Sequence, residues 1–587
     1  MVVLLFLTVA CTAPGTGSKS GEDSGRGVSD DRDGDFYADD EDCDPDDPAT
    51  HPGADELCDG KDNDCDGVTD DGFPATVWHP DRDGDSYGDS AEQLLTCLEP
   101  AEWVTDAGDC DDANATVYPG AEEICDDGVV QDCASTEAEA RTRCALAGDL
   151  TLGTSGLSLR GDAEGDQAGA ALAAGRLLST GPALAVGAPG RDSAGQGSGA
   201  VWVVAGSTSG TALLGDVATL VTGLGTGDQL GAALAGVGDL DGDGDDELLV
   251  GAPGDETSGN AAGAVWLLPG PVVAGPVSAG GARLTAPTAG DRGGAAVAAV
   301  GDMDGDGYPE WAIGAWGSDV GGIDAGAAYL YGRMVGADAS LGAADRVLWG
   351  ASPYQHAGAA LGGAGDLDGD GLAELVVGAP TDVAGGTGAG GAWVVAAWPG
   401  ASAGLGDVGV GWLGVAGDAA GTAVAGLGDV DGDGYGDLAV GAPGGGGGAG
   451  QVYVVAGPAG GGGSLAAAAS ILVGDAAGDF AGGAVAGVGD VDGDARGDLL
   501  VGGPAVDGAG ADSGGAWLVV AVSPGTGELS RGAAVLRGPE AGGRAGAAVS
   551  TGGDVDANGF PEIFVGGPGV AYGDVVGAAW LLAGGGP

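Results

Sequence analysis

The stretch GDLDGDGDDELLVGAP, residues 238–253, joins an acidic loop to an apolar run. Asp239, Asp241 and Asp243 alternate with other residues, Gly244 follows, and Glu247 stands at the ninth place, directly before the run LLV. Ca²⁺ takes about six to eight oxygen ligands, which a tight loop offers from places 1, 3 and 5, from a carbonyl at place 7 and from a closing acid. Because a β-type run follows the loop, we expect it to join two strands rather than to open a helix as an EF-hand does.

The same loop recurs at a nearly constant interval. Its copies begin at Asp239, Asp302, Asp366, Asp429, Asp490 and Asp554, in steps of 63, 64, 63, 61 and 64 residues. One step before Asp239 lies Arg176, in a segment that keeps the final GAP but lacks the acids. A period of this length indicates a repeat architecture. The sequence therefore predicts seven repeats, six of them with a calcium loop.

The expected ligands stand at places 1, 3, 5 and 9 of each loop. They are Asp239, Asp241, Asp243 and Glu247; Asp302, Asp304, Asp306 and Glu310; Asp366, Asp368, Asp370 and Glu374; Asp429, Asp431, Asp433 and Asp437; Asp490, Asp492, Asp494 and Asp498; and Asp554, Asp556, Asn558 and Glu562. Ala495 replaces the turn glycine at place 6 of the fifth loop, and Asn558 removes a charge from the sixth. We expect these two loops to bind most weakly.

Each repeat also carries a short strand before the loop, a VGAP strand after it, a variable glycine-rich turn and an aromatic-bearing strand. The recurring Trp202, Trp266, Trp393, Trp517 and Trp580 occupy matching places in the last of these, which indicates packing between strands. The chain ends just after the aromatic strand of the seventh repeat. We therefore expect a strand near residues 157–160 to complete that repeat and close the ring, which removes exposed sheet edges.

These residues resemble the FG-GAP repeat of integrin α-subunit N-terminal domains over residues 150–587. The resemblance implies an all-β fold, a seven-bladed β-propeller with calcium loops in six blades and about six Ca²⁺ ions. The chain departs from the pattern in places: the Phe of the first half-motif is replaced in most repeats, and GAP becomes GAW at residues 314–316 and GGP at residues 502–504 and 566–568.

The composition argues against several functions. The chain carries 88 acidic and 18 basic residues, a formal charge of −70, which disfavours nucleic acid or an anionic membrane surface as a partner. It contains 3 histidines, and its lysines are Lys19 and Lys61. Histidine is the usual general base near neutral pH, so this scarcity indicates a protein that is not an enzyme.

The N-terminus indicates export. Residues 1–11, MVVLLFLTVAC, are an apolar run too short to span a membrane and ending in Cys11. They resemble a bacterial lipoprotein signal peptide, which implies lipidation of Cys11; cleavage of an ordinary secretory signal is the alternative. Residues 12–30 are rich in Gly and Ser and read as a flexible tether.

Residues 31–144 form a module rich in Cys and Asp, with two related units at residues 31–72 and 81–133. These units resemble a metal-binding motif of bacterial surface proteins, including a copper-associated one. Two further calcium loops are expected here, one from Asp31, Asp33, Asp35 and Asp39, the other from Asp81, Asp83, Asp85 and Asp89. Phe36 and Ser86 replace the turn glycine, so we expect these sites to be weak.

Eight cysteines remain after Cys11: Cys43, Cys58, Cys65, Cys97, Cys110, Cys125, Cys133 and Cys144. An even number in an exported segment with a small core indicates disulfides. Among the many possible connectivities we expect Cys58 with Cys65, Cys97 with Cys110, Cys125 with Cys133, and Cys43 with Cys144. A thiolate site for copper or zinc is the alternative, but the surrounding carboxylates suit Ca²⁺ better.

We expect an exported, calcium-stabilised protein of the cell envelope or outer surface, lipid-anchored, whose propeller serves in adhesion or recognition. Its partner would be a surface protein or polysaccharide, with no nucleic acid and membrane contact only through the lipid. The alternatives are capture of copper or another cation by the N-terminal module, or a non-catalytic part of a surface hydrolase system.

Overall fold

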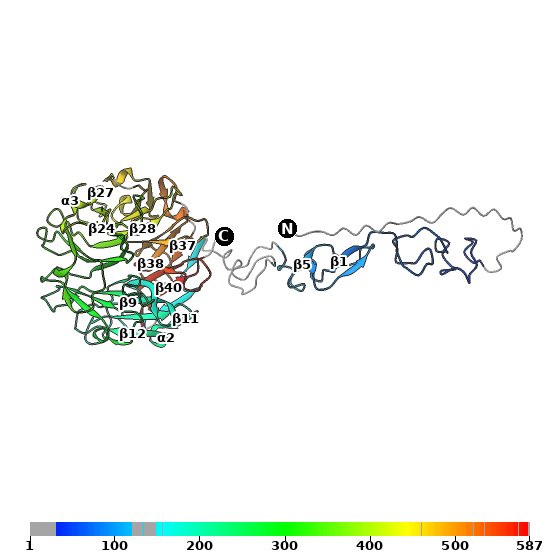
Figure 1. The fold of residues 1–587 in the computed structure, drawn as a ribbon, viewed down its shortest axis with the longest axis horizontal. Helices are drawn as coiled ribbons and strands as arrows, with labels where there is room; N and C mark the ends of the chain where they lie inside the picture. Colours follow the sequence, from blue (N-terminus) through cyan, green and yellow to red (C-terminus); the bar gives the residue numbers. More distant parts are fainter. Residues whose placement is uncertain are drawn as a thin grey trace. The chain divides into compact units, whose positions relative to one another are not determined.

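The computed structural model describes residues 31–119, 133, 148–154, 156–458, 461–520, 522–532, 534–572 and 575–584. Cys11, the tether at residues 12–30, Cys125 and Cys144 lie outside these residues. The chain divides into two compact bodies, an N-terminal module and a C-terminal domain that contains all described residues from 148 onward (Figure 1).

Within the described residues the C-terminal domain contains seven five-stranded sheets. In each, four strands pair antiparallel, and a short fifth strand pairs in parallel with the outermost of the four. This fifth strand comes from the connection that follows the third strand of the next repeat. Each repeat therefore contributes one short strand to the sheet of the repeat before it.

The sheets of the first four repeats, each given from its innermost to its outermost strand, are β8 (Ala171–Leu178), β9 (Gly181–Ala188), β10 (Ala200–Ala205), β12 (Ala218–Thr222) and β16 (Gly275–Pro276); β13 (Ala233–Gly236), β14 (Leu248–Ala252), β15 (Ala264–Leu268), β17 (Ala282–Thr285) and β21 (Ala339–Ser340); β18 (Ala296–Gly301), β19 (Glu310–Ala315), β20 (Ala327–Tyr331), β22 (Arg346–Trp349) and β26 (Ala403–Gly404); and β23 (Ala360–Gly363), β24 (Leu375–Ala379), β25 (Gly391–Val395), β27 (Val410–Leu413) and β31 (Gly463–Ser464).

The sheets of the last three repeats are β28 (Ala423–Gly428), β29 (Asp437–Ala442), β30 (Gln451–Val455), β32 (Ser470–Val473) and β36 (Gly525–Glu528); β33 (Ala484–Gly489), β34 (Asp498–Gly503), β35 (Gly515–Val519), β37 (Ala534–Arg537) and β6 (Gly148–Thr151); and β38 (Ala548–Gly553), β39 (Glu562–Tyr572), β40 (Val575–Leu582), β7 (Leu157–Arg160) and β11 (Thr211–Leu213). Short helical turns follow most of the fifth strands: α2 (Leu214–Val217), α3 (Leu405–Val408) and the 3₁₀ turns Val277–Ala279, Leu341–Ala343, Leu465–Ala467 and Leu529–Arg531; a further 3₁₀ turn, Gly446–Gly448, lies between β29 and β30.

The sheets form a closed ring. Their innermost strands contact one another in cyclic order, from β8 through β13, β18, β23, β28 and β33 to β38 and back to β8. Isolated parallel bridges also join each sheet to the next, and Ala168↔Gly577 joins the last to the first. As expected from the sequence, β7 completes the final sheet: Leu159 lies opposite Ala579 on β40. The all-β propeller fold is thereby confirmed.

The glycines of the repeat lie where neighbouring sheets meet. A Cβ added to Gly251, the glycine of GAP in the second repeat, would lie 2.1 Å from the carbonyl oxygen of Gly294 in the third, and the other repeats show the same contact. Gly294 itself has a φ of +84°, a conformation that L residues rarely adopt. Both halves of the FG-GAP pattern therefore keep glycine because two backbones approach each other closely at the junction between sheets.

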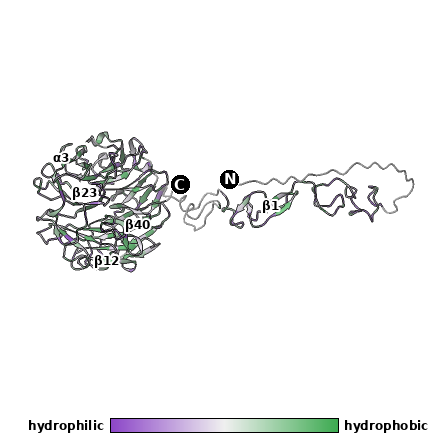
Figure 2. Cartoon of the chain, viewed as in Figure 1, coloured by the Kyte–Doolittle hydropathy of each residue, from purple (hydrophilic) through white to green (hydrophobic). Residues whose placement is uncertain are grey.

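Apolar side chains fill the spaces between neighbouring sheets, and the strands of the propeller are correspondingly hydrophobic in Figure 2. Trp202, Trp517 and Trp580 are at most 1% exposed and Trp266 is 5% exposed. These tryptophans pack within the propeller, as their matching places in the repeats indicate.

The N-terminal module is poor in regular structure. Its strands are β1 (Thr76–Pro80), β2 (Gly88–Asp89), β3 (Leu94–Thr96), β4 (Trp103–Val104) and β5 (Ala107–Asp109). β1 pairs antiparallel with β3 and β4, and β2 pairs in parallel with β5. No helix among the described residues of either body is long and apolar enough to cross a membrane.

Disulfides hold this module together, but the expected pairing is wrong. The bonds among the described residues are Cys43–Cys65, Cys58–Cys97 and Cys110–Cys133. They exclude all four expected pairs: Cys58–Cys65, Cys97–Cys110, Cys125–Cys133 and Cys43–Cys144. The cysteine of each Asp-Cys-Asp segment is bonded to a cysteine in a later loop of the same unit. The spacing of cysteines along the chain does not reveal this pairing.

Candidate metal centres

The six acidic loops of the propeller occupy equivalent positions. Each joins the innermost strand of a sheet to the second strand, as the loop at residues 239–247 joins β13 to β14. The glycine-rich turns join the second strand to the third and so lie at the opposite ends of the sheets. The loops and the variable turns are therefore on opposite faces of the propeller.

The first aspartate of each loop shapes the turn. Asp239 accepts hydrogen bonds from the backbone N–H groups of Gly242 at 2.6 Å and Gly244 at 2.9 Å. Asp302, Asp366, Asp429 and Asp490 accept the equivalent pairs of bonds. The aspartates at places 3 and 5 accept from the amides two residues further on. The loops thus gather their carboxylates around one centre.

Place 6 has a left-handed backbone in every loop. The φ is +96° at Gly244 and +67° at Ala495, and it is +82° at both Phe36 and Ser86 in the N-terminal module. Residues other than glycine adopt this conformation only at a cost. The loop geometry therefore persists where the sequence has lost the turn glycine.

The closing acid at place 9 is buried. Glu247, Glu310, Glu374, Asp437 and Asp498 are 0% exposed and Glu562 is 1% exposed. One carboxylate oxygen accepts from the backbone N–H at place 2, as Glu247 does from Leu240 at 2.6 Å. The second oxygen of Glu310, Glu374, Asp498 and Glu562 has no protein partner. A buried carboxylate oxygen without a donor is costly unless a cation binds it.

Burial shifts the titration of these acids. Desolvation, followed by the charges of the loop aspartates, raises the pKa of Glu247, Glu310, Glu374 and Glu562 to about 7 and that of Asp498 to about 8. In the fourth repeat, carboxylate oxygens of Asp366, Asp368, Asp370 and Glu374, one from each residue, lie within 4.8 Å of one another. This all-oxygen set fits the preference of Ca²⁺.

Neighbouring loops are joined by backbone hydrogen bonds that the sequence did not reveal. The N–H at place 8 of one loop donates to the carbonyl at place 1 of the preceding repeat: Ala373 to Asp302 at 2.8 Å, Gly436 to Asp366 at 2.8 Å, Gly497 to Asp429 at 2.9 Å and Asp246 to Arg176 at 3.0 Å. Pro309 and Pro561 occupy place 8 in the third and seventh repeats, where proline has no N–H to donate.

Side chains at place 7 reinforce these contacts. We expected this place to offer only a backbone carbonyl. In the loops beginning at Asp366, Asp429, Asp490 and Asp554, however, its side chain also lies beside the place-4 glycine of the preceding loop. A Cβ on Gly369 would come within 2.5 Å of the Tyr435 ring, and one on Gly493 within 3.0 Å of Phe560. The loops beginning at Asp302, Asp366, Asp429, Asp490 and Asp554 therefore form a connected series on one face.

Arg176 takes the place of the first aspartate in the repeat that has no loop. Its backbone N–H donates to Asp246 at 2.7 Å, and its Nε donates to the carbonyl oxygen of Gly244 at 3.0 Å. The repeat that lacks the acids thus contributes a positive side chain that hydrogen-bonds to the neighbouring acidic loop.

The loops of the N-terminal module have the same turn. Asp31 accepts from Gly34 at 2.8 Å, and Asp81 accepts from Gly84 at 2.7 Å. The expected closing acids have other partners, since Asp39 forms an ion pair with Arg32 at 3.3 Å and Asp89 accepts from the N–H of Ala91 at 2.8 Å.

A further loop of this kind was missed. Asp62 accepts from the N–H groups of Asp66 at 3.1 Å and Gly67 at 2.9 Å, and Gly67 has a φ of +94°. The oxygens of Asp62, Asp64 and Asp66 lie within 4.8 Å of one another. The signal was present in the sequence as DNDCDG, residues 62–67, which places acids at 1, 3 and 5 and glycine at 6.

The comparisons with known families agree with this architecture. Three segments match the FG-GAP repeat. They are residues 230–268, 357–395 and 420–455. Each segment contains the first three strands of a sheet and the acidic loop between the first two. Residues 42–71 and 109–139 match the Cu-binding MopE family, described as "Putative metal-binding motif". No curated protein matches the chain at a significant level.

Proposed function

We propose that this chain is an exported, calcium-stabilised surface protein whose propeller binds a partner and performs no catalysis. FG-GAP repeats and a disulfide-bonded metal-binding motif together are typical of extracellular binding modules. The six described members of the cysteine set are disulfide-bonded, so carboxylates are the available ligands there, and oxygen ligands favour Ca²⁺ over copper.

The observation that carries the recognition role is a group of exposed apolar side chains on the face opposite the acidic loops. Val320 is 54% exposed, Ile323 59%, Tyr354 55% and Val383 61%. Ile323 and Tyr354 come from neighbouring repeats and are joined by a backbone hydrogen bond of 2.8 Å from Tyr354 to Ile323. Clustered apolar side chains on exposed loops mark interaction surfaces.

The cavity bounded by the innermost strands supports a non-enzymatic role. It has a volume of about 430 Å³ and is lined mainly by the backbone and small side chains of β8, β13 and β38. Among its described lining residues Arg176, Asp246 and Asp554 carry charge, and none is His, Lys or Cys. The carboxylate of Asp246 already accepts a hydrogen bond from the backbone N–H of Arg176.

Binding to cells tests this proposal. Fluorescently labelled protein is mixed with intact cells of the source organism in millimolar calcium and then in EGTA. We expect saturable binding that is lost in EGTA. Ile323→Ser and Tyr354→Ser should weaken binding, whereas Tyr308→Ser, an exposed residue of an acidic loop on the other face, should not.

Absence of binding in both conditions would contradict the recognition role. Thermal melting in the same buffers tests calcium stabilisation separately, because an ion that binds only the folded state raises the melting temperature. An unchanged melting temperature in EGTA would contradict that part of the proposal.

A further inference from the structure

The second loop of the N-terminal module has carboxylate oxygens with no protein partner. Asp81 uses both of its oxygens to accept amide hydrogen bonds from Gly84 and Ser86. By contrast, both oxygens of Asp83 and the Oδ2 of Asp85 are shielded from solvent and accept no hydrogen bond. Desolvated acceptors of like charge in one loop require a positive group between them.

A further carboxylate reaches this loop from another segment. Asp109 is 5% exposed, and β5 places it opposite Asp89, at the exit of the loop. Its Oδ1 accepts from the N–H of Asp111 at 2.9 Å, and its Oδ2 has no partner. The segment that carries Asp109 also contacts the loop directly, because Asp112 accepts a hydrogen bond from the backbone N–H of Arg82 at 2.9 Å.

The first unit repeats this arrangement. Asp42 is 9% exposed and accepts from the N–H of Asp44 at 2.9 Å, as Asp109 does from Asp111. The Oδ2 atoms of Asp33 and Asp35 in the adjacent loop are shielded and unpartnered. Asp42 precedes Cys43 just as Asp109 precedes Cys110.

We propose that Asp109 and Asp42 close the two N-terminal Ca²⁺ sites, Asp109 with Asp81, Asp83 and Asp85, and Asp42 with Asp31, Asp33 and Asp35. Asp89 and Asp39, at the ninth place of each loop, are not the closing ligands, since they bond elsewhere. The acid that closes the site thus comes from an Asp-Cys-Asp segment distant in sequence. The inference does not depend on the recognition role of the propeller.

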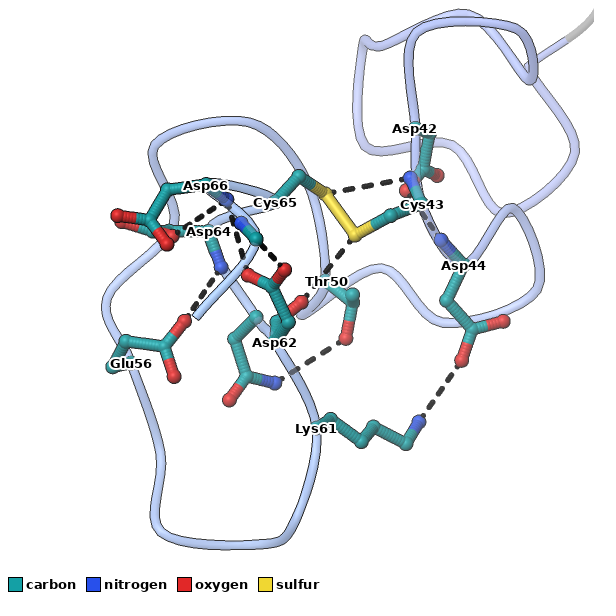
Figure 3. The surroundings of a disulfide bond; sticks show 12 residues. Asp42, Cys43, Asp44, Thr50, Glu56, Lys61, Asp62, Asp64, Cys65 and Asp66 are labelled. Atoms are coloured by element: carbon teal, nitrogen blue, oxygen red, sulfur yellow. Dashed lines mark hydrogen bonds and ion pairs between the residues drawn. A yellow bond between two sulfur atoms is a disulfide. The ribbon is translucent and has the colours of Figure 1, made fainter. Parts of the chain in front are cut away.

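A disulfide anchors each closing ligand. The N–H of Cys110 donates to the Sγ of Cys133 at 2.9 Å, and that of Cys43 donates to the Sγ of Cys65 at 3.4 Å. Figure 3 shows Asp42 beside the Cys43–Cys65 bond, which ties its segment to the loop of Asp62, Asp64 and Asp66. Ion binding and the disulfide therefore hold the same segment, so each should stabilise the other.

The test compares Asp109→Asn with Asp89→Asn in the full chain. Bound calcium is counted by equilibrium dialysis and metal analysis. We expect Asp109→Asn to bind one Ca²⁺ fewer per chain than the unmodified protein and Asp89→Asn to bind the same number. Unchanged binding in Asp109→Asn, or loss of an ion in Asp89→Asn, would overturn the proposal.

A second measurement covers the case in which Asp109→Asn fails to form its disulfides, which thiol titration would show. The unmodified protein is treated with a reductant in calcium and in EGTA, and the bonds are followed by peptide mapping. We expect calcium to slow reduction of Cys110–Cys133 and Cys43–Cys65 more than reduction of Cys58–Cys97. Equal slowing of all three bonds, or none, would count against the anchored ligand.

Discussion

At the scale of single residues, Ala495 is held in a left-handed conformation that glycine occupies in each of the other five propeller loops. We expect Ala495→Gly to stabilise the protein by about 1 kcal/mol, because glycine adopts this conformation without steric cost. Gly434→Ala, at the same place in the preceding repeat, is the matched control; a Cβ there meets nothing within 4 Å, so it should destabilise through conformation alone. Denaturant unfolding in calcium measures both, and a destabilised Ala495→Gly would refute the argument.

The charge of Glu310 should destabilise the folded protein when no ion is bound and stabilise it when calcium is bound. Its side chain is fully buried, and one oxygen has no protein partner. Glu310→Gln removes a buried charge, so we expect a higher melting temperature than the unmodified protein in chelator and a lower one in calcium. The exposed Glu256→Gln should shift neither. A variant that is less stable in both conditions would show that the charge is not the deciding factor.

The buried closing acids also set a pH dependence. Their pKa rises from the ordinary Glu value of 4.5 to about 7 in Glu247, Glu310, Glu374 and Glu562. The folded state therefore holds protons that the unfolded state has released, and this contribution is full below about pH 4.5 and lost as pH rises through about 7. In chelator we expect the melting temperature to fall between pH 5 and pH 8. In saturating calcium this fall should disappear, because the ion replaces the proton; a persistent fall would contradict the assignment.

At the scale of the elements, the bonds between loops link one site to the next. The loop beginning at Asp429 is bonded on both sides, through Gly436 to Asp366 and through Gly497 to Asp429 itself. The loop beginning at Asp554 has Pro561 at the donor place. We expect Asp431→Asn to lose more than one bound Ca²⁺ at subsaturating calcium and Asp556→Asn to lose one. Equal losses in equilibrium dialysis would show that the loops bind independently.

The elements also show what the sequence could predict. The period and the acids at places 1, 3, 5 and 9 are local, so the repeats, the loop turns and the closing strand β7 follow from the sequence. The disulfide pairing and the approach of Asp109 to its loop depend on how a distant segment returns in space, and no local pattern encodes that return. The bonds from place 8 to the preceding repeat depend on the ring itself.

At the scale of the whole molecule, the ring is closed by strands from both ends of the propeller. Leu159 on β7 is 0% exposed and lies opposite Ala579 on β40. We expect Leu159→Ala to destabilise the protein by about 2–5 kcal/mol through the cavity it leaves. Leu213→Ala on β11 of the same sheet, where the side chain is 42% exposed, should cost much less. Similar losses for the two variants in denaturant unfolding would mean that closure contributes little.

The pairing of strands from the two ends of the propeller sequence also determines when the ring can close during synthesis. Asp149 on β6 forms an ion pair with Arg537 on β37, 388 residues later in the chain. The sequence separation between β7 and its partner β40 is larger still. Contacts between residues so far apart form late in folding. A ribosome that stops early would release a product with unpaired strands at both ends, open to proteases. Only a chain that includes the last repeat can pair these strand edges. Protease resistance would therefore distinguish complete propellers from truncated products.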